Sequence, residues 1–224
     1  MTGRAKAARA ALPSVIDTED DLSAGLADLV RGEPLFARAL EIGGRPPLRR
    51  RAASLASLLE IIVAQQVSKA SAAAIWLRME TVLAPLTAER LATATDDDYR
   101  AAGLSRPKVR TMRAIADAML SGGLAFDRLA GLEDAQVHTH LTAVKGIGPW
   151  TADIYLLSCL GRADAWPAGD LALQVAAGEL LGLGTRPDAK AMAALSEPWR
   201  PWRGVAARCL WSYYGATRSR DVVP

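Results

Sequence analysis

Cysteine and histidine are scarce in this 224-residue chain, and long apolar runs are missing. Two cysteines, Cys159 and Cys209, are too few for a disulfide framework or for a cysteine-ligated iron–sulfur cluster. Two histidines, His138 and His140, are too few for a histidine-rich metal site. No apolar run reaches the roughly 18 residues that suggest a spanning helix, and the basic N-terminal segment lacks the apolar region of a signal peptide. We therefore expect a cytoplasmic protein with no membrane partner.

Lysine is also scarce, because only five of the 27 basic residues are lysine and the rest are arginine, which binds phosphate through two parallel hydrogen bonds. Against 24 acidic residues, the net charge is +3. This small positive charge permits a nucleic-acid partner and predicts a local basic face. Arg106, Lys108, Arg110 and Lys145 are candidates for that face.

Apolar residues recur at helical spacing along most of the chain, as in Leu55, Leu58, Leu59 and Ile62. No convincing alternating strand pattern is present. The sequence therefore predicts an all-α fold of about ten helices with short loops. We expect residues 1–18 to form a loose basic tail and 19–224 to form one unit.

The most informative stretch is L-T-A-V-K-G-I-G-P-W-T-A at 141–152. Gly146 and Gly148 permit a tight hairpin between two helices, because glycine adopts backbone angles that other residues avoid. Pro149 then starts a helix whose first amides are exposed, which makes a site suited to phosphate. The alternative interpretation is an ordinary corner between two helices.

Asp170 follows Gly148 by 22 residues and opens an apolar helix. A helix N-cap is the common role of such an aspartate. The two roles are compatible, since a capping carboxylate is held rigidly, as a catalytic carboxylate must be.

Five of the six tryptophans fall between positions 150 and 211. Each could be a core residue, whereas two aromatic rings beside a cleft would stack on a flat base. Gln65 and Gln66 end an apolar helix. They are either exposed side chains beside a cap or a wedge that fills the gap left by an extruded nucleotide.

Together these residues carry a resemblance that extends from about residue 20 to about residue 218. The chain resembles the helix-hairpin-helix DNA glycosylases, in particular the 3-methyladenine DNA glycosylase II branch, which acts on alkylated bases. The strings that match, in order and with similar spacing, are I-I-V-A-Q-Q-V-S at 61–68, G-L-S-R-P-K-V-R at 103–110, V-K-G-I-G-P-W-T-A-D at 144–153, P-A-G-D-L-A-L-Q at 167–174 and W-R-P-W-R-G-V-A-A-R-C-L-W at 199–211.

The resemblance implies two helical lobes with a DNA-binding cleft between them. We expect one lobe over about 50–155 and the other over about 19–49 plus 156–224. The hairpin at Gly146 and Gly148, with Lys145, would hold a DNA phosphate, and Gln66 matches the wedge. In the family the hairpin carbonyls often bind a monovalent cation. The matching carbonyls are those of Thr142, Val144 and Ile147, for Na⁺ or K⁺, and no other cofactor is required.

The family's essential carboxylate matches Asp170, and Trp150 and Trp211 match positions that line the base pocket. An alkylated purine is cationic and is attracted to an indole face. Bifunctional relatives carry a nucleophilic lysine at the position of Trp150, so the resemblance implies a monofunctional enzyme that uses water and leaves an abasic site. Trp166 and Trp202 are assigned to the core or the cleft wall.

The leading hypothesis is therefore excision of alkylated, 3-methyladenine-like bases from double-stranded DNA by base flipping, in base excision repair. One alternative is a glycosylase for deaminated or oxidised bases. The other is a helix-hairpin-helix DNA-binding module without catalysis. We expect a monomer, associated with the nucleoid if the source is bacterial.

Overall fold

The computed structural model describes residues 15–218, and within them every named element is a helix. The elements are α1 (Glu19–Gly32), α2 (Leu35–Gly43), α3 (Leu55–Ala64), α4 (Lys69–Val82), α5 (Ala88–Thr93), α6 (Asp96–Ala101), α7 (Arg106–Leu120), α8 (Phe126–Leu129), α9 (Asp134–Thr142), α10 (Pro149–Ser158), α11 (Leu171–Leu180), α12 (Ala189–Leu195), a 3-10 turn (Glu197–Trp199) and α13 (Arg203–Arg218). The all-α prediction is confirmed. The short helix α8 and the 3-10 turn escaped prediction because each is too short to show a period.

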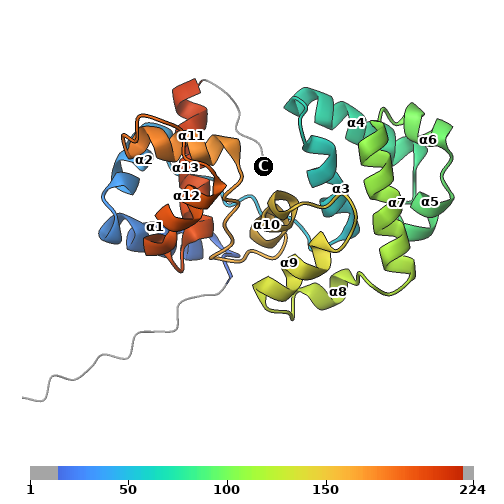
Figure 1. Ribbon diagram of the computed structural model, residues 1–224, viewed down its shortest axis with the longest axis horizontal. Helices are drawn as coiled ribbons and strands as arrows, with labels where there is room; N and C mark the ends of the chain where they lie inside the picture. The colour runs from blue at the N-terminus through green and yellow to red at the C-terminus, as the bar shows by residue number, and fades with distance from the viewer. Residues whose placement is uncertain (1–14, 219–224) are drawn as a thin grey trace, which may run out of the picture.

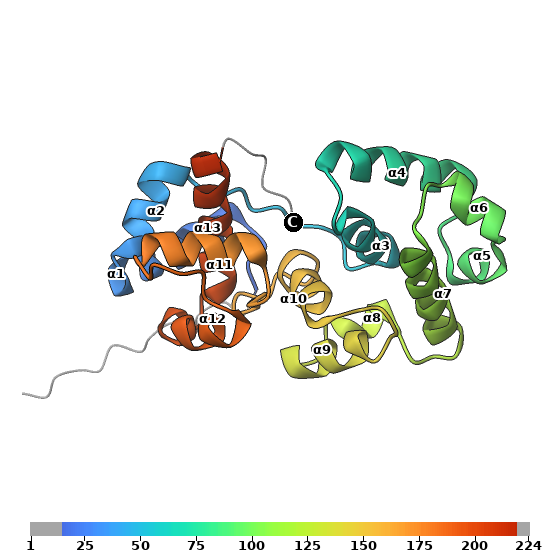
Figure 2. The same cartoon turned by 45° about the horizontal axis from the view of Figure 1, so that its top comes forward.

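The helices form two groups that lie side by side (Figures 1 and 2). Helices α1, α2, α11, α12 and α13 make one group, in which α13 packs against α2, α11 and α1. The other contains α3 to α9, and α10 lies at its edge nearest the first group. Helix α10 packs against α9 and α3, so it belongs to this second group while facing the first.

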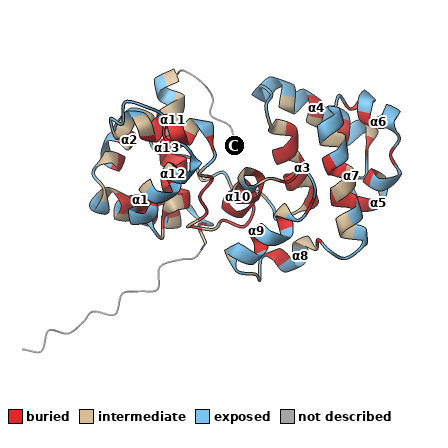
Figure 3. Ribbon diagram, viewed as in Figure 1, coloured by how far each residue is buried: buried red, intermediate tan, exposed pale blue. Residues whose placement is uncertain are grey.

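Helices α3 and α10 are largely buried, and α10 lies where the two groups meet. In both α3 and α10, seven of ten residues are buried, as the red segments of Figure 3 show. A helix that is apolar almost all round must be covered on most sides. Local signals set its ends: Ser54 caps α3 and Ser68 caps α4, each with its side chain accepting a backbone N–H.

Arginine side chains tie the two groups together through backbone carbonyls. Arg208 of α13 is 4% exposed and donates to the carbonyls of Leu48, Gly204 and Leu157. Burial lowers its pKa to about 10. Arg50 donates to the carbonyl of Ser158 at 2.7 Å. These bonds help to fix the position of α10 relative to α13. The geometry of the site depends on that position.

The chain before α1 differs from its prediction. Ile16 is fully buried and its N–H donates to the carbonyl of Gly161 at 2.7 Å, while Val15 forms an isolated bridge with Arg162. The prediction of a loose tail through residue 18 is therefore wrong for residues 15–18, because Ile16 fills an apolar position in the core. Residues 1–14 lie outside the described residues. No helix within 15–218 has the length and apolar character needed to cross a bilayer.

Candidate active site

The predicted hairpin joins α9 to α10, and its two glycines have different surroundings. Gly146 has φ +95°, and a Cβ there would lie 2.0 Å from Oγ1 of Thr111. Only glycine fits that position. Gly148 is the N-cap of α10, and no heavy atom lies within 4 Å of the place its Cβ would occupy. The hairpin is thus packed on α7 at Gly146 and open at Gly148.

The N-terminus of α10 at Gly148 has no side-chain cap. Gly148 has no side chain, so it cannot cap α10 as Ser54 caps α3. Pro149 occupies the first helical position, where a missing N–H costs nothing. The N–H of Trp150 is one of the first-turn donors that α10 itself cannot pair. Lys145 is exposed beside them. The hairpin therefore presents first-turn N–H groups of α10 and the exposed Lys145 close together in the chain.

Asp170 is the N-cap of α11, and it is only 8% exposed. Its Oδ1 accepts the backbone N–H of Leu173 at 3.0 Å, and its own N–H donates to the carbonyl of Pro167 at 2.9 Å. The capping interpretation of Asp170 is therefore correct. The cap orients the carboxylate at the positive end of a helix, where negative charge is stabilised.

Two indoles, from different helices, also hold the Asp170 carboxylate. Nε1 of Trp150, on α10, donates to Oδ2 at 2.8 Å, and Nε1 of Trp211, on α13, donates to Oδ1 at 3.2 Å. The structure thus brings together three residues that were predicted from separate motifs. Trp150 is half-buried, whereas Trp211 is 4% exposed. Trp150 consequently offers surface to a ligand, and Trp211 mainly orients the carboxylate.

The paired glutamines have unlike positions. Nε2 of Gln65 donates to Oγ1 of Thr151 at 2.8 Å, so Gln65 is half-buried and its amide faces α10. Gln66 is exposed and has φ +57°, a left-handed conformation that is uncommon for a residue with a Cβ. Of the two candidates for a wedge, only Gln66 projects. Gln65 instead connects the end of α3 to α10 through its side-chain hydrogen bond.

The predicted basic face loses one member. Arg106, Arg110 and Lys145 are exposed. Lys108 instead points inward and donates to the carbonyls of Val63 at 2.7 Å and Gln65 at 3.0 Å. Burial lowers the pKa of its ammonium group. The prediction that Lys108 contributes to a basic surface is thus wrong, because its charge is directed at the end of α3.

The two tryptophans that were assigned to the core or the cleft wall are core residues. Trp166 is 7% exposed and meets Trp199 edge to face, with 5.4 Å between ring centroids. Trp202 is 3% exposed, and its Nε1 donates to Asp28 at 2.9 Å.

Asp153 is a further titratable group on α10 that the sequence reasoning missed. Burial raises the pKa of its carboxyl to about 7, and nearby Arg203 opposes that shift. Nε2 of His138 lies 3.7 Å from Oδ1 of Asp153. An aspartate within the apolar run W-T-A-D-I-Y was the signal that could have revealed it.

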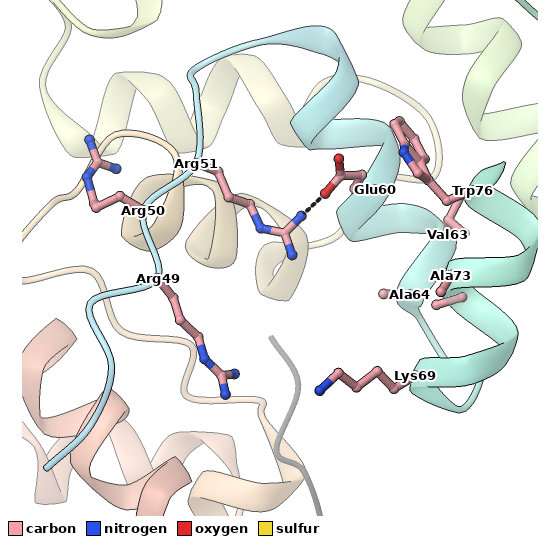
Figure 4. Close-up of a pocket in the computed structure, with 10 residues that line it drawn as sticks. Arg49, Arg50, Arg51, Glu60, Val63, Ala64, Lys69, Ala73 and Trp76 are labelled. Carbon is pink, nitrogen blue, oxygen red and sulfur yellow. Dashed lines mark hydrogen bonds and ion pairs between the residues drawn. The ribbon is translucent and has the colours of Figure 1, made fainter. Parts of the chain in front are cut away.

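A basic cavity of about 500 Å³ lies between the segment before α3 and the facing sides of α3 and α4 (Figure 4). Arg49, Arg51 and Lys69 line it, and Trp76 contributes an indole. Arg51 forms an ion pair with Glu60 on α3. The cavity is near the α3–α4 connection, but its lining contains none of the residues predicted for catalysis.

Within the described part of the chain, no group of three or more His, Cys, Asp and Glu side chains could hold a metal ion. The hairpin offers backbone carbonyls only. Val144 follows the C-terminal end of α9, where the helix dipole is negative. Its carbonyl accepts the N–H of Ile147 at 3.0 Å and keeps a second lone pair. Hard oxygen ligands of this kind fit Na⁺ or K⁺ rather than a transition metal.

Comparison with known proteins places these features in a family. Residues 59–201 match the family model described as HhH-GPD superfamily base excision DNA repair protein. The chain is 30% identical over 158 residues to DNA-3-methyladenine glycosylase 1 of Schizosaccharomyces pombe, covering 69% of each chain. It superimposes on the crystal structure of DNA-3-methyladenine glycosidase from Bacillus halodurans with a TM-score of 0.72 and 33% identity, over 90% of this chain and 91% of that one.

Another similar protein is much longer. The probable bifunctional transcriptional activator/DNA repair enzyme AlkA of Mycobacterium tuberculosis is 37% identical over 111 residues, which are 49% of this chain and 21% of that protein. The chain therefore spans only about a fifth of that relative.

Proposed function

Because the chain belongs to the HhH-GPD superfamily of base excision DNA repair proteins, we propose that it is a monofunctional DNA glycosylase that hydrolyses the bond between an alkylated purine and deoxyribose in double-stranded DNA. One observation carries the proposal: the Asp170 carboxylate is held by two indole N–H groups and a backbone N–H, in a cap beside the hairpin helix. The names of the similar proteins from Schizosaccharomyces pombe and Bacillus halodurans support 3-methyladenine-like substrates.

Asp170 stabilises the positive charge that develops on the sugar. Cleavage of an N-glycosidic bond passes through an oxocarbenium-like state, and a fixed carboxylate lowers its free energy without having to reorient. Three donors hold Asp170 in place before substrate arrives. The preorganisation comes from α10, α11 and α13, so it depends on both groups of helices.

The substrate supplies part of the driving force. A purine alkylated at N3 or N7 carries a positive charge, and when the bond between the base and C1′ breaks, both electrons leave with the base, which departs neutral. The sugar thereby acquires the positive charge, water adds its oxygen to C1′, and the Asp170 carboxylate accepts a proton from that water. The partly exposed indole of Trp150 attracts the cationic ring before cleavage.

Position 150 also determines which reaction follows. Its side chain is an indole whose N–H is bonded to Asp170, so it provides no amine for a Schiff base with C1′. Lys145 is exposed in the hairpin, where a phosphate is its natural partner. The product is consequently an abasic site in an intact strand.

The hairpin and Gln66 dock the duplex. The first-turn donors of α10 and Lys145 bind a backbone phosphate. The carbonyls of Thr142, Val144 and Ile147 would hold a monovalent cation, which would supply further positive charge for binding that phosphate. Gln66, exposed at the end of α3, enters the stack where the damaged nucleotide has left. Affinity should then fall with rising salt, since phosphate contacts dominate it.

The decisive experiment measures free base released from methylated duplex DNA, followed by a separate assay for strand cleavage. We expect release by the wild type with intact strands, and release slower by about 10²- to 10⁴-fold by Asp170→Asn. Asp188→Asn is a matched control, because Asp188 caps α12 in the same way but is exposed. Binding without release by the wild type would refute the alkylated-base proposal, and unchanged release by Asp170→Asn would refute the mechanism.

A further inference from the structure

Lys108 contacts the end of α3 rather than solvent. Its Nζ lies 2.7 Å from the carbonyl of Val63 and 3.0 Å from that of Gln65. The last carbonyls of a helix have no partner within the helix and carry its negative end, so a cation satisfies both needs at once. Lys108 therefore fixes the point at which the chain leaves α3 and enters the α3–α4 corner, residues 65–68.

A second anchor holds the same corner from α10. The amide of Gln65 donates to Oγ1 of Thr151 at 2.8 Å, and Thr151 is 2% exposed. Thr151 directly follows Trp150, whose indole holds Asp170. The α3–α4 corner is thus connected to α7 by Lys108 and to α10 by Gln65.

The face of α7 that carries Lys108 also supports the hairpin. Thr111 lies one turn after Lys108, is 7% exposed, and packs so closely on Gly146 that a Cβ there would lie 2.0 Å from its Oγ1. Residues three apart on a helix are neighbours on its surface. One turn of α7 consequently contacts both the α3–α4 corner and the phosphate hairpin.

Contacts on both sides of Gln66 explain its unusual backbone conformation. A left-handed conformation in a residue with a Cβ is unfavourable and persists only where its surroundings impose it. Gln66 has φ +57° while its side chain is exposed, so the restraint must come from its flanks. Lys108 holds the carbonyl immediately before Gln66, and the Ser68 side chain caps α4 by accepting the N–H of Ser71 at 3.2 Å immediately after the corner.

We propose that Lys108 is a positioning residue that sets the place of Gln66 relative to the hairpin. Gln66 is then aligned with the site of the extruded nucleotide when the hairpin binds its phosphate. The inference rests on the proposed glycosylase function. It assigns to this lysine no contact with DNA. Because α7 contacts both the hairpin and the α3–α4 corner, the distance between these two parts is fixed. Gln66 therefore meets the duplex already in its inserted conformation when the hairpin binds its phosphate.

The test replaces Lys108 by methionine, which keeps the length of the side chain and removes its donors. Lys190→Met is the matched control, because Lys190 is exposed on α12 in the other group of helices. Three quantities are measured: single-turnover release of base from methylated duplex, the fluorescence of 2-aminopurine placed beside a stable abasic-site analogue, and the salt dependence of binding to that analogue.

We expect Lys108→Met to lose about 10- to 100-fold in single-turnover release, which is the scale of an ångström-sized misplacement. The 2-aminopurine signal should fall, because insertion is impaired, while the salt slope stays that of the wild type. Lys190→Met should match the wild type in all three. A slope reduced by about one unit would instead identify Lys108 as a phosphate ligand and overturn the proposal. Unchanged release and fluorescence would overturn it too.

A second variant covers the case in which Lys108→Met does not fold. Thr151→Val keeps the shape of the side chain and removes the acceptor for Gln65, so it loosens the same corner from α10. It should lower the 2-aminopurine signal with no change in the salt slope, and a full signal would refute the inference. Because the abasic analogue requires no cleavage, this readout decides the role of the corner even if the wild type releases no alkylated base.

Discussion

Replacing Asp170 by asparagine should separate the catalytic role of the carboxylate from its structural role. Oδ1 accepts two donors, the N–H of Leu173 and the indole of Trp211, so the amide oxygen of asparagine must take that place. The amide nitrogen then faces Nε1 of Trp150 at the 2.8 Å now spanned by a hydrogen bond. Two donors would face each other in a buried site.

The size of the effect follows from that geometry. An unpaired buried donor costs about 1–3 kcal/mol. In a chain of this length each kcal/mol shifts Tm by about 2–4 °C, so Asp170→Asn should lower Tm by roughly 2–12 °C. Asparagine still caps a helix as well as aspartate does, so Asp188→Asn should leave Tm unchanged. Base release by Asp170→Asn should fall by about 10²–10⁴-fold, the range for loss of a positioned acid–base group.

A substitution of Trp150 tests this donor geometry. Phenylalanine at position 150 removes the indole N–H, so Trp150→Phe should destabilise the wild type but restore stability to Asp170→Asn. Calorimetry or denaturant unfolding of the four proteins should give a coupling of about 1–3 kcal/mol in this sense. Base release must stay lost in the double variant. Additive stabilities, or recovered release, would show that the donor geometry around Asp170 is not as described.

Three other predictions concern the rest of the fold. Burial raises the pKa of Asp153 to about 7, so its neutral form is favoured in the folded chain, and stability should decline by up to about 4 kcal/mol as pH rises from about 4 to about 7. Asp153→Asn should remove that decline in denaturant unfolding followed against pH, and an unaltered pH profile would contradict the assignment. Gly146→Ala should destabilise the chain by several kcal/mol because of its φ of +95° and its contact with α7, whereas Gly148→Ala, which meets nothing within 4 Å, should leave Tm within about 2 °C. Burial raises the pKa of Cys159 to about 11 and that of Cys209 to about 12, so both thiols should resist iodoacetamide at pH 8 in the folded protein, and rapid labelling seen by mass spectrometry would count against their burial.

Local chemistry made much of the architecture readable in advance. The apolar spacing of α3, the capping serines at 54 and 68, and Pro149 at the start of α10 are signals carried by neighbouring residues, and the structure has a helix boundary at each. The hairpin was predictable for the same reason, because G-I-G followed by proline restricts the backbone over only a few residues. Elements without such signals, such as α8 with its four residues, were missed.

Other features depended on residues far apart in the sequence. Lys108 was expected on a basic surface, and nothing in its own neighbourhood indicated the carbonyls of α3 that it contacts. Gln65 and Gln66 looked equivalent, but Thr151 of α10 draws one inward and leaves the other exposed. Ile16 was assigned to a loose tail because the segment that covers it, at Gly161, follows it by more than a hundred residues.

Local spacing and short motifs were enough to predict the helices and the hairpin, and the family resemblance added Asp170, Trp150 and Trp211 as candidate site residues. The hydrogen bonds from Trp150 and Trp211 to the two oxygens of Asp170 follow only from the folded arrangement. That arrangement requires α10, α11 and α13 to be positioned so that their side chains lie within hydrogen-bond distance of one another. Such distances are set by the packing of whole helices and by Arg208 across their junction, which no single segment of the chain encodes.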